Sequence, residues 1–158
     1  MRIRKFQAED FEEVHRLDLA CFVPGISYSA GMLKYFFSLP AAICLVAEDG
    51  FPSESGSGVS AGNTIVGFIL AEAAVPQGHI ITLDVAESQR RTGTGSALLR
   101  ELEERMATRE VKSIVLETAV DNESGIAFWE HHGYRTEAVI KQYYLGRIDA
   151  WEMRKKLG

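Results

Sequence analysis

Apolar and polar positions alternate at the start of the chain and then recur at helical spacing. "RIRKF", residues 2–6, alternates and predicts a short strand. Asp10 can cap a helix whose apolar face carries Phe11, Val14, Leu17 and Cys21. "VPGIS" interrupts the pattern, and "SAGMLKYFFSL" predicts a second helix that ends before Pro40. One strand and two helices are therefore expected in this part of the chain.

Two apolar runs follow, "AICLVAE" and "TIVGFILAEA", and both have the length of strands. The segment between them, 49–63, is rich in Gly and Ser and lacks periodicity, which is typical of a flexible loop. A linker between two domains is the alternative, but the flanking strands are too short to stand apart. We therefore expect a single domain, 1–158, with a long hairpin loop at 49–63.

After this hairpin the pattern changes to strands that alternate with helices. Strands are predicted at "HIITLDV" and "VKSIVLETAV", and helices at "GTGSALLRELEERMATRE" and "NESGIAFWEHHG". Two further strands, "YRTEAVIKQYY" and "DAWEMRKKL", close the chain. This order predicts an α/β fold in which at least part of the sheet is parallel.

Composition narrows the class of function. Hydrophobic residues make up 46% of the 158 residues and charged residues 25%, the balance of a soluble globular protein. No apolar run approaches the ~20 residues that span a bilayer, and "MRIRKFQAED" lacks the apolar core of a secretory signal. We therefore expect a cytoplasmic protein with no membrane contact. The net charge of −5 disfavours nucleic acid and favours a cationic partner such as an amine.

The chain has only two cysteines, Cys21 and Cys44, and both lie in apolar contexts. A disulfide framework or a zinc cluster needs more cysteines at closer spacing. Both are expected to be buried, reduced thiols, and no metal is expected.

The segment "QRRTGTGSALL", 89–99, joins a predicted strand to a predicted helix. Gly93 and Gly95 allow a sharp turn and a close approach of the backbone to a ligand. The start of the helix favours an anion such as phosphate, and Arg90 and Arg91 add positive charge. The loop lacks the lysine of a P-loop and the third glycine of a dinucleotide-binding fingerprint. From the residues alone, a phosphate site and a plain turn are both open.

"VAESQRRTGTGSALL" resembles the acyl-CoA-binding motif of the GCN5-related N-acetyltransferases, the GNAT family, and the predicted element order is similar along nearly the whole chain. The resemblance implies a mixed sheet of about seven strands with four helices, splayed at strands four and five. It implies acetyl-CoA as the cosubstrate, and backbone groups of Leu83 and Val85 would bind the pantetheine arm and the acetyl carbonyl. The loop residues that would hold the pyrophosphate are Arg90, Arg91, Thr92, Gly93, Thr94, Gly95 and Ser96.

Within the family, the chain resembles the ribosomal-protein N-terminal acetyltransferase branch, which implies roles for single residues. Glu117 in "IVLETAV" matches a glutamate proposed as the general base, and the alternative is a solvent-facing edge position. Asn122 is a favoured N-cap and would also contact the cofactor arm.

Trp129 stands where that branch usually has the tyrosine that protonates the CoA thiolate, so it is expected to contact the cofactor. An indole N–H cannot give up its proton, so the acid must come from elsewhere. Tyr144 is the catalytic candidate, with Tyr134, Tyr143 and solvent as alternatives.

"IKQYYLGRIDAWEMRKKL" resembles the last hairpin of N-terminal acetyltransferases, in which tyrosines line the peptide slot. Tyr143 and Tyr144 match them, and because adjacent strand residues face opposite ways, only one is expected to line the slot. In "FVPGISYS", Ile26 and Tyr28 are the expected contacts of the first substrate residue.

The expected reaction is direct transfer of an acetyl group to an amine, by a monomer or homodimer. The favoured acceptor is the N-terminal α-amine of a peptide or protein. A small amine, such as a polyamine, amino acid or antibiotic, is one alternative, and a non-catalytic acyl-CoA-binding module is another.

The histidines are expected to have no catalytic role. His131 and His132 in "FWEHHGY" should end a helix before Gly133, where the helix dipole favours a cation. His79 is expected to be exposed at the start of a strand, and His15 to lie on the surface of the first helix.

Overall fold

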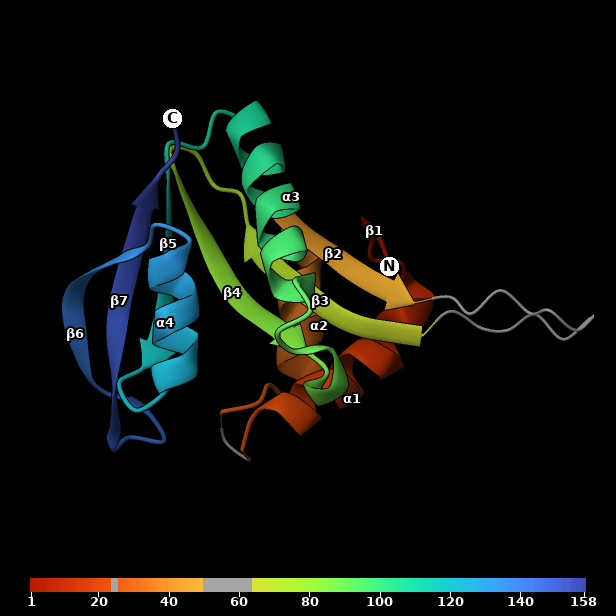
Figure 1. The fold of residues 1–158 in the computed structure, drawn as a ribbon, viewed down its shortest axis with the longest axis horizontal. Coiled ribbons are helices and arrows are strands. Elements are labelled where there is room, and N and C mark those ends of the chain that lie inside the picture. The colour runs from red at the N-terminus through yellow and green to blue at the C-terminus, as the bar shows by residue number, and fades with distance from the viewer. Residues whose placement is uncertain (24–25, 50–63) are drawn as a thin grey trace, which may run out of the picture.

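The computed structural model of the protein describes residues 1–23, 26–49 and 64–158. Within these ranges seven strands form one sheet in the order β1-β2-β3-β4-β5-β7-β6, accompanied by four α-helices (Figure 1). All neighbouring strands are antiparallel except β4 and β5, which are parallel. The expected mixed sheet is therefore confirmed. The predicted loop 49–63 lies, beyond Asp49, outside the described residues.

The elements follow the predicted order along the chain. The strands are β1 (Arg2–Lys5), β2 (Ala42–Asp49), β3 (Thr64–Glu72), β4 (Gln77–Val85), β5 (Ser113–Ala119), β6 (Arg135–Tyr144) and β7 (Ile148–Lys156). The α-helices are α1 (Phe11–Cys21), α2 (Ala30–Ser38), α3 (Thr94–Thr108) and α4 (Glu123–His131), with short 3₁₀ turns η1 (Ala8–Asp10) and η2 (Glu87–Gln89).

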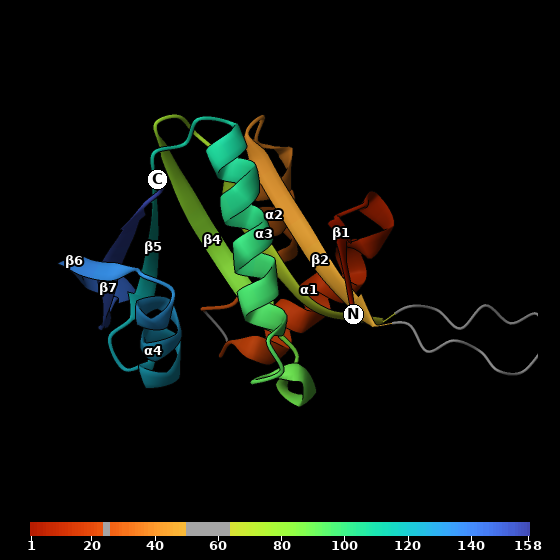
Figure 2. The same cartoon turned by 45° about the horizontal axis from the view of Figure 1, so that its top comes forward.

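The helices cover the two faces of the sheet unequally. α1 and α2 pack on β2, β3 and β4, whereas α3 and α4 lie on the opposite face (Figures 1 and 2). On the face that carries α1 and α2, the described helices leave β5, β7 and β6 open (Figure 2). Because helices lie on both faces, the hydrophobic core has two parts, one on each side of the sheet.

Both parts of the core follow the apolar pattern of the sequence. Leu98, Leu102 and Met106, which recur at helical spacing in α3, are all fully buried against the sheet. Val14 of α1 and Leu33 of α2 are fully buried on the other side. Burial of these faces fixes the helices over the strands that lead into the candidate site.

The sheet divides where β4 meets β5. Parallel pairing covers only three residue pairs, from Gln77–Ser113 to His79–Val115. Beyond them β4 stays paired with β3 and β5 stays paired with β7, so the two strands diverge (Figure 1). The register of β3 and β4 shifts between Leu70 and Ala71, and such a bulge bends a strand. The expected splay between strands four and five is confirmed.

Some expectations about individual side chains are wrong. Cys21 and Cys44 are free thiols but are half-buried rather than fully buried. His15 is also half-buried rather than on the surface. Among the described residues, no helix is long and apolar enough to cross a membrane, and no group of three or more potential ligands could hold a metal ion. The cytoplasmic location stays a prediction.

Asp10 occupies the predicted N-cap position of α1, but its side chain makes no capping hydrogen bond to the helix. Its carboxylate instead accepts hydrogen bonds from Arg4 Nη1 and Nη2, at 2.8 and 2.9 Å, and from the Gln7 N–H at 2.7 Å. Arg4 Nε also donates to Glu48 at 2.9 Å, so one guanidinium joins β1, β2 and η1. A two-pronged contact with a cation is stronger than one bond to a helix N–H, which explains the difference.

Replacement of Arg4 by Met should lower the free energy of unfolding by roughly 3 kcal/mol at neutral pH. Asp10 and Glu48, only 6% and 4% exposed, would lose their shared cation. The hydrogen bond from Arg4 lowers the pKa of Asp10. The contribution of the Arg4–Asp10 pair to the free energy of unfolding is therefore complete above the ordinary pKa of 3.8 and is lost as the pH falls through the lowered pKa.

Urea denaturation of both proteins at pH 7 and in strong acid measures this difference. Arg2→Met is the matched control, because Arg2 is exposed and lies 3.8 Å from Glu48. The assignment is wrong if Arg4→Met costs as little as the control, or if its cost does not shrink in acid.

Candidate active site

The glycine loop has the backbone conformation of an anion site. Gly93, the N-cap of α3, has φ +89°, a left-handed conformation that glycine adopts without strain. Arg91 also has a positive φ of 64°, which is uncommon for a residue with a side chain. No described side chain caps α3, so the first N–H groups of the helix are available to a ligand.

The side chains of the loop mainly hold the loop itself. Thr92 donates to the Gln89 carbonyl, and its hydroxyl lies 3.0 Å from that of Thr94. Arg90 Nε turns back to donate to the Val85 carbonyl at 3.1 Å. Any ligand held by this loop would therefore contact its backbone first. Binding by Arg90, Arg91, Thr92, Gly93, Thr94, Gly95 and Ser96 stays a prediction.

The backbone of β4 turns its unpaired edge toward the splay. The Ala86 N–H donates to Val66 on β3 at 2.8 Å. Because backbone groups alternate between the two edges of a strand, the N–H and C=O groups of Val85 and Leu83 face the other edge. That edge borders the gap between β4 and β5 (Figure 1). The two residues thus lie where backbone donors to an acyl-CoA were expected.

His79 belongs to the candidate site, although the sequence predicted only an exposed strand start. Its Nε2 lies 2.6 Å from Oε2 of Glu117. His79 pairs with Val115, two residues before Glu117, so both side chains lie on the open face where the splay begins. The Glu117 side chain is 18% exposed and the His79 side chain 39%, so the pair can reach both a bound amine and solvent. In the sequence, the only signal for this pair was a polar residue in each of two apolar strands. No local pattern indicated that the two residues would face each other.

Three tyrosines lie near Glu117. The Tyr144 hydroxyl donates to the Glu117 carbonyl at 3.3 Å, and the Tyr28 hydroxyl donates to the Ile81 carbonyl on β4 at 3.5 Å. Burial raises the pKa of Tyr28, Tyr143 and Tyr144 above the ordinary value of 10.0. All three therefore keep their phenolic protons at neutral pH and can donate hydrogen bonds.

Tyr143 and Tyr144 do not face opposite ways, so the expectation that only one lines the slot loses its basis. Their rings meet edge to face with centroids 4.8 Å apart. Gln142 has φ +53°, and the register of β6 and β7 shifts nearby, which interrupts the alternation of the strand. Asp149 holds this bulge by accepting from the Gln142 N–H at 2.9 Å.

Asn122 and Trp129 lie on either end of α4. The Asn122 side chain accepts from the Gly125 N–H at 3.1 Å, so the predicted cap is confirmed. Trp129 is buried in the core, with its ring 5.4 Å from that of Tyr134. Tyr134 is also buried, in the same part of the core as Trp129 and the apolar face of α3. Cofactor contacts of Asn122 and Trp129 stay predictions.

The end of α4 is as predicted, but one histidine differs from expectation. Gly133 follows the helix with φ +91°. His132 Nε2 lies 2.8 Å from the Ser96 hydroxyl, and burial, together with the charge of His131, lowers the pKa of His132. His132 is therefore favoured as neutral, rather than as the cation that the helix dipole suggested. Ile26 is half-buried and donates its N–H to Val23; its substrate contact stays a prediction.

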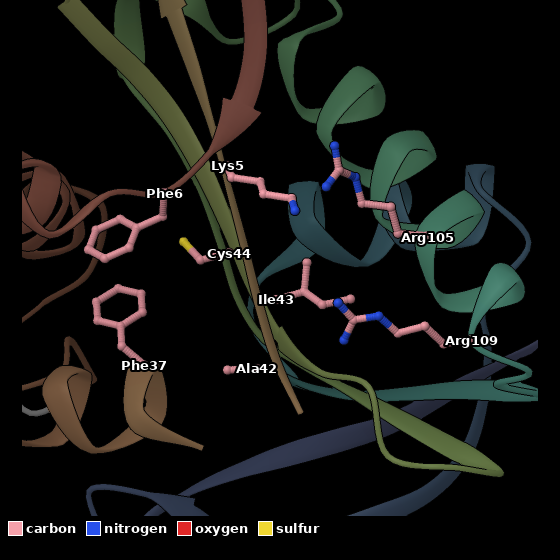
Figure 3. A pocket seen from close by; sticks show the side chains of 8 residues that line it. All are labelled: Lys5, Phe6, Phe37, Ala42, Ile43, Cys44, Arg105 and Arg109. Carbon is pink, nitrogen blue, oxygen red and sulfur yellow. The ribbon is translucent and has the colours of Figure 1, made fainter. Parts of the chain in front are cut away.

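A cavity of about 290 Å³ lies elsewhere, beside β1 and β2. Three cations approach Ile43 from one side and two aromatic rings border Cys44 on the other (Figure 3). The cavity contains none of the predicted site residues; it is lined by Lys5, Phe6, Phe37, Ala42, Ile43, Cys44, Arg105 and Arg109.

Comparisons with known proteins agree with this geometry. A family model described as "Acetyltransferase (GNAT) family" matches residues 11–134. An uncharacterised N-acetyltransferase of Methanocaldococcus jannaschii is 32% identical over 99% of this chain and 92% of its own length. An N-alpha-acetyltransferase of Sulfurisphaera tokodaii is 33% identical over 52% of this chain and 50% of its own length.

A solved structure extends the likeness to the whole fold. The ribosomal-protein-S18-alanine N-acetyltransferase from Escherichia coli superposes with a TM-score of 0.81 at 18% identity. The superposition covers 99% of this chain and 94% of that protein. At this identity the likeness concerns the fold alone.

Replacement of Gly93 by Ala should lower the free energy of unfolding by roughly 1–2 kcal/mol and weaken the binding of acetyl-CoA. A Cβ at Gly93 would meet nothing within 4 Å, so the cost comes from the left-handed backbone alone. Gly31→Ala in α2 is the control, because its Cβ also meets nothing and its backbone is helical.

Urea denaturation and calorimetric titration with acetyl-CoA test both variants. Equal stability and equal affinity for Gly93→Ala and wild type would show that the loop does not need this conformation.

Proposed function

Because the chain belongs to the GNAT family of acetyltransferases, we propose that it transfers the acetyl group of acetyl-CoA directly to the N-terminal α-amine of a peptide or protein. The contact between His79 and Glu117 at the start of the splay is the observation that carries this proposal. This contact supports the proposal because an imidazole and a carboxylate, either of which could accept a proton, meet on the open face beside the gap where the family's cofactor is expected.

The first chemical step would be loss of a proton from the acceptor ammonium. Glu117 would take that proton as general base, and His79, the more exposed of the two, would pass it to solvent. The free amine then attacks the thioester carbon. A second carboxylate, Glu152, pairs directly with Glu117 across β5 and β7, and adds negative charge that favours a cationic acceptor.

The second step would be collapse of the tetrahedral intermediate. Backbone N–H groups on the free edge of β4, at Leu83 and Val85, would stabilise the negative charge that develops on the acetyl oxygen. The carbon–sulfur bond then breaks, and the nitrogen, which became cationic on attack, loses its second proton as the amide forms. The CoA thiolate takes a proton from Tyr144, which is protonated at rest and contacts the Glu117 carbonyl, and the proton released by the nitrogen restores the Tyr144 phenol. The products are the N-acetylated acceptor and CoA.

The choice of a peptide α-amine over a small amine rests on the tyrosines that border the open face. Tyr143 and Tyr144 project together from the last hairpin, and Tyr28 approaches β4 from the other side. Such walls can bind both the first residue of a peptide and its backbone. The relative named N-alpha-acetyltransferase supports the same choice, although the chain matches half of its length.

Replacement of Glu117 by Gln should lower kcat/KM roughly 100-fold or more, because the general base is lost. Release of CoA with a panel of free N-terminal peptides is the assay. Glu152→Gln is the matched control, since it removes a carboxylate directly opposite on the sheet without removing the base. If Glu117 and His79 act as a unit, the double variant Glu117→Gln/His79→Gln should be no slower than Glu117→Gln alone.

Three outcomes would overturn parts of this proposal. Equal losses in Glu117→Gln and Glu152→Gln would indicate a general charge effect instead of a base. Turnover with polyamines, amino acids or antibiotics but with no peptide would replace the acceptor. Binding of acetyl-CoA without any turnover would make the protein an acyl-CoA-binding module.

Replacement of Cys21 by Ser should leave kcat within about twofold of wild type. Cys21 is close to the cofactor strand, with its Sγ 3.5 Å from the Val85 carbonyl. Burial raises the pKa of its thiol, so the nucleophilic thiolate is disfavoured and no acetyl-enzyme is expected at this residue. An acetylated Cys21 in a mass spectrum after incubation with acetyl-CoA alone would contradict direct transfer.

A further inference from the structure

Two carboxyl groups lie buried behind the splay, outside the acid–base machinery. Asp18 on α1 is 0% exposed and Asp84 on β4 is 1% exposed. A fully buried carboxylate is costly unless it is paired, and two of them in contact cannot both stay ionised cheaply. The side chains of Asp18 and Asp84 are within hydrogen-bond reach of each other. Their arrangement therefore needs an explanation.

The hydrogen bonds leave one oxygen unpaired on each side chain. Asp18 Oδ2 accepts from the Tyr28 N–H at 2.7 Å, and Asp84 Oδ1 accepts from the Thr82 hydroxyl. Among the described residues, Asp18 Oδ1 and Asp84 Oδ2 are buried atoms without a hydrogen-bond partner. A single proton between these two oxygens would satisfy both atoms.

We propose that Asp84 carries this proton and donates it to Asp18, and that the resulting carboxyl–carboxylate bond positions Tyr28 beside the acceptor. The bond runs from Asp84 Oδ2 to Asp18 Oδ1. Asp18 in turn holds the backbone N–H of Tyr28, whose hydroxyl reaches Ile81 on β4. Asp84 and Asp18 are then positioning residues, and neither touches a reacting atom.

The surroundings favour the protonated form of Asp84. Burial is the main cause that raises its pKa well above the ordinary 3.8, followed by the hydrogen bond with Asp18 and the charge of Asp18. Arg90 acts in the opposite direction, though more weakly. The other titratable groups that feel Asp84 are neutral: Tyr28, Cys21 and Cys44, each with a raised pKa.

The bond joins two segments that serve different substrates. Asp84 stands between Leu83 and Val85, whose backbone faces the cofactor gap, and Tyr28 belongs to the segment before α2 that was predicted to cover the acceptor. The shared proton would keep these two segments in register. The link to the acceptor rests on the proposed function, whereas the proton itself does not.

Infrared difference spectroscopy of Asp84→Asn against wild type at neutral pH tests the proton directly. Wild type should show the carbonyl band of one buried protonated carboxyl group, which shifts in D₂O, and the variant should lack it. The amide that Asp84→Asn introduces can donate to Asp18 permanently, so the fold should be kept. Absence of the band in wild type would overturn the proposal whatever the enzyme acetylates.

Thermal unfolding across pH provides an independent sign. Because the pKa of Asp84 is raised in the folded state, wild type loses stability as the pH rises from 3.8 through that raised pKa. The variant Asp84→Asn does not ionise at this position, so its melting temperature relative to wild type should increase over the same range. A constant difference across pH would contradict a proton held by Asp84.

The positioning role is tested by a variant that breaks the bond. Asp84→Ala should speed amide hydrogen exchange at Tyr28 at least tenfold, and should raise KM for the acceptor more than it lowers kcat. Asp84→Asn should restore both values toward wild type. Tyr28→Phe is the control, because it removes only the hydroxyl bond to Ile81 and keeps the N–H bond to Asp18.

The infrared, melting and exchange measurements distinguish a failure of the shared-proton proposal from a failure of the proposed function. Protected exchange at Tyr28 in Asp84→Ala would overturn the positioning role even if the peptide acceptor is right. If no peptide is acetylated, the infrared band, the melting curves and the exchange rates still decide on the shared proton. If Asp84→Ala fails to fold, Asp84→Val, which also removes the carboxyl group and suits a strand, takes its place and should speed exchange at Tyr28 in the same way.

Discussion

The early end of pairing between β4 and β5 is the constraint on which the site depends. Three residue pairs join the strands, and beyond them each strand keeps a partner on its outer side only. The inner edge of β4 therefore carries backbone donors and acceptors without a strand to bind them. At the point of separation the His79 and Glu117 side chains meet on the open face. A continuous ladder would fill this gap and leave no room for a thioester between the strands.

The buried carboxyl groups of the molecule differ from the proposed base beside this gap in their exposure to water. The buried carboxyl groups of Asp10 and Asp84 each have a specific partner, Arg4 and Asp18 respectively. Neither pair lies where a proton must leave during acetyl transfer. The proposed base is instead partly exposed, so the proton that it takes can reach solvent.

The fold was predictable because its signals are local. Apolar residues at helical spacing located α3, and the glycine pair located the turn before it. The contacts that matter most at the site join residues far apart in the chain. His79 and Glu117 are 38 residues apart, and no local pattern determines which residues of two splayed strands face each other. The bulge at Gln142 was equally hidden, because it depends on Asp149 from the next strand.

The bulged hairpin formed by β6 and β7 has a consequence for how this protein can change over generations. β6 is an edge strand and is exposed along most of its length, whereas β4, the strand proposed to bind the cofactor, has α1 on one face and α3 on the other. Substitutions near Tyr143 can therefore reshape the wall proposed to meet the acceptor at little cost to the core. The strand proposed to bind the cosubstrate is thus separate from the hairpin proposed to meet the acceptor, so the acceptor can change while the cosubstrate stays the same.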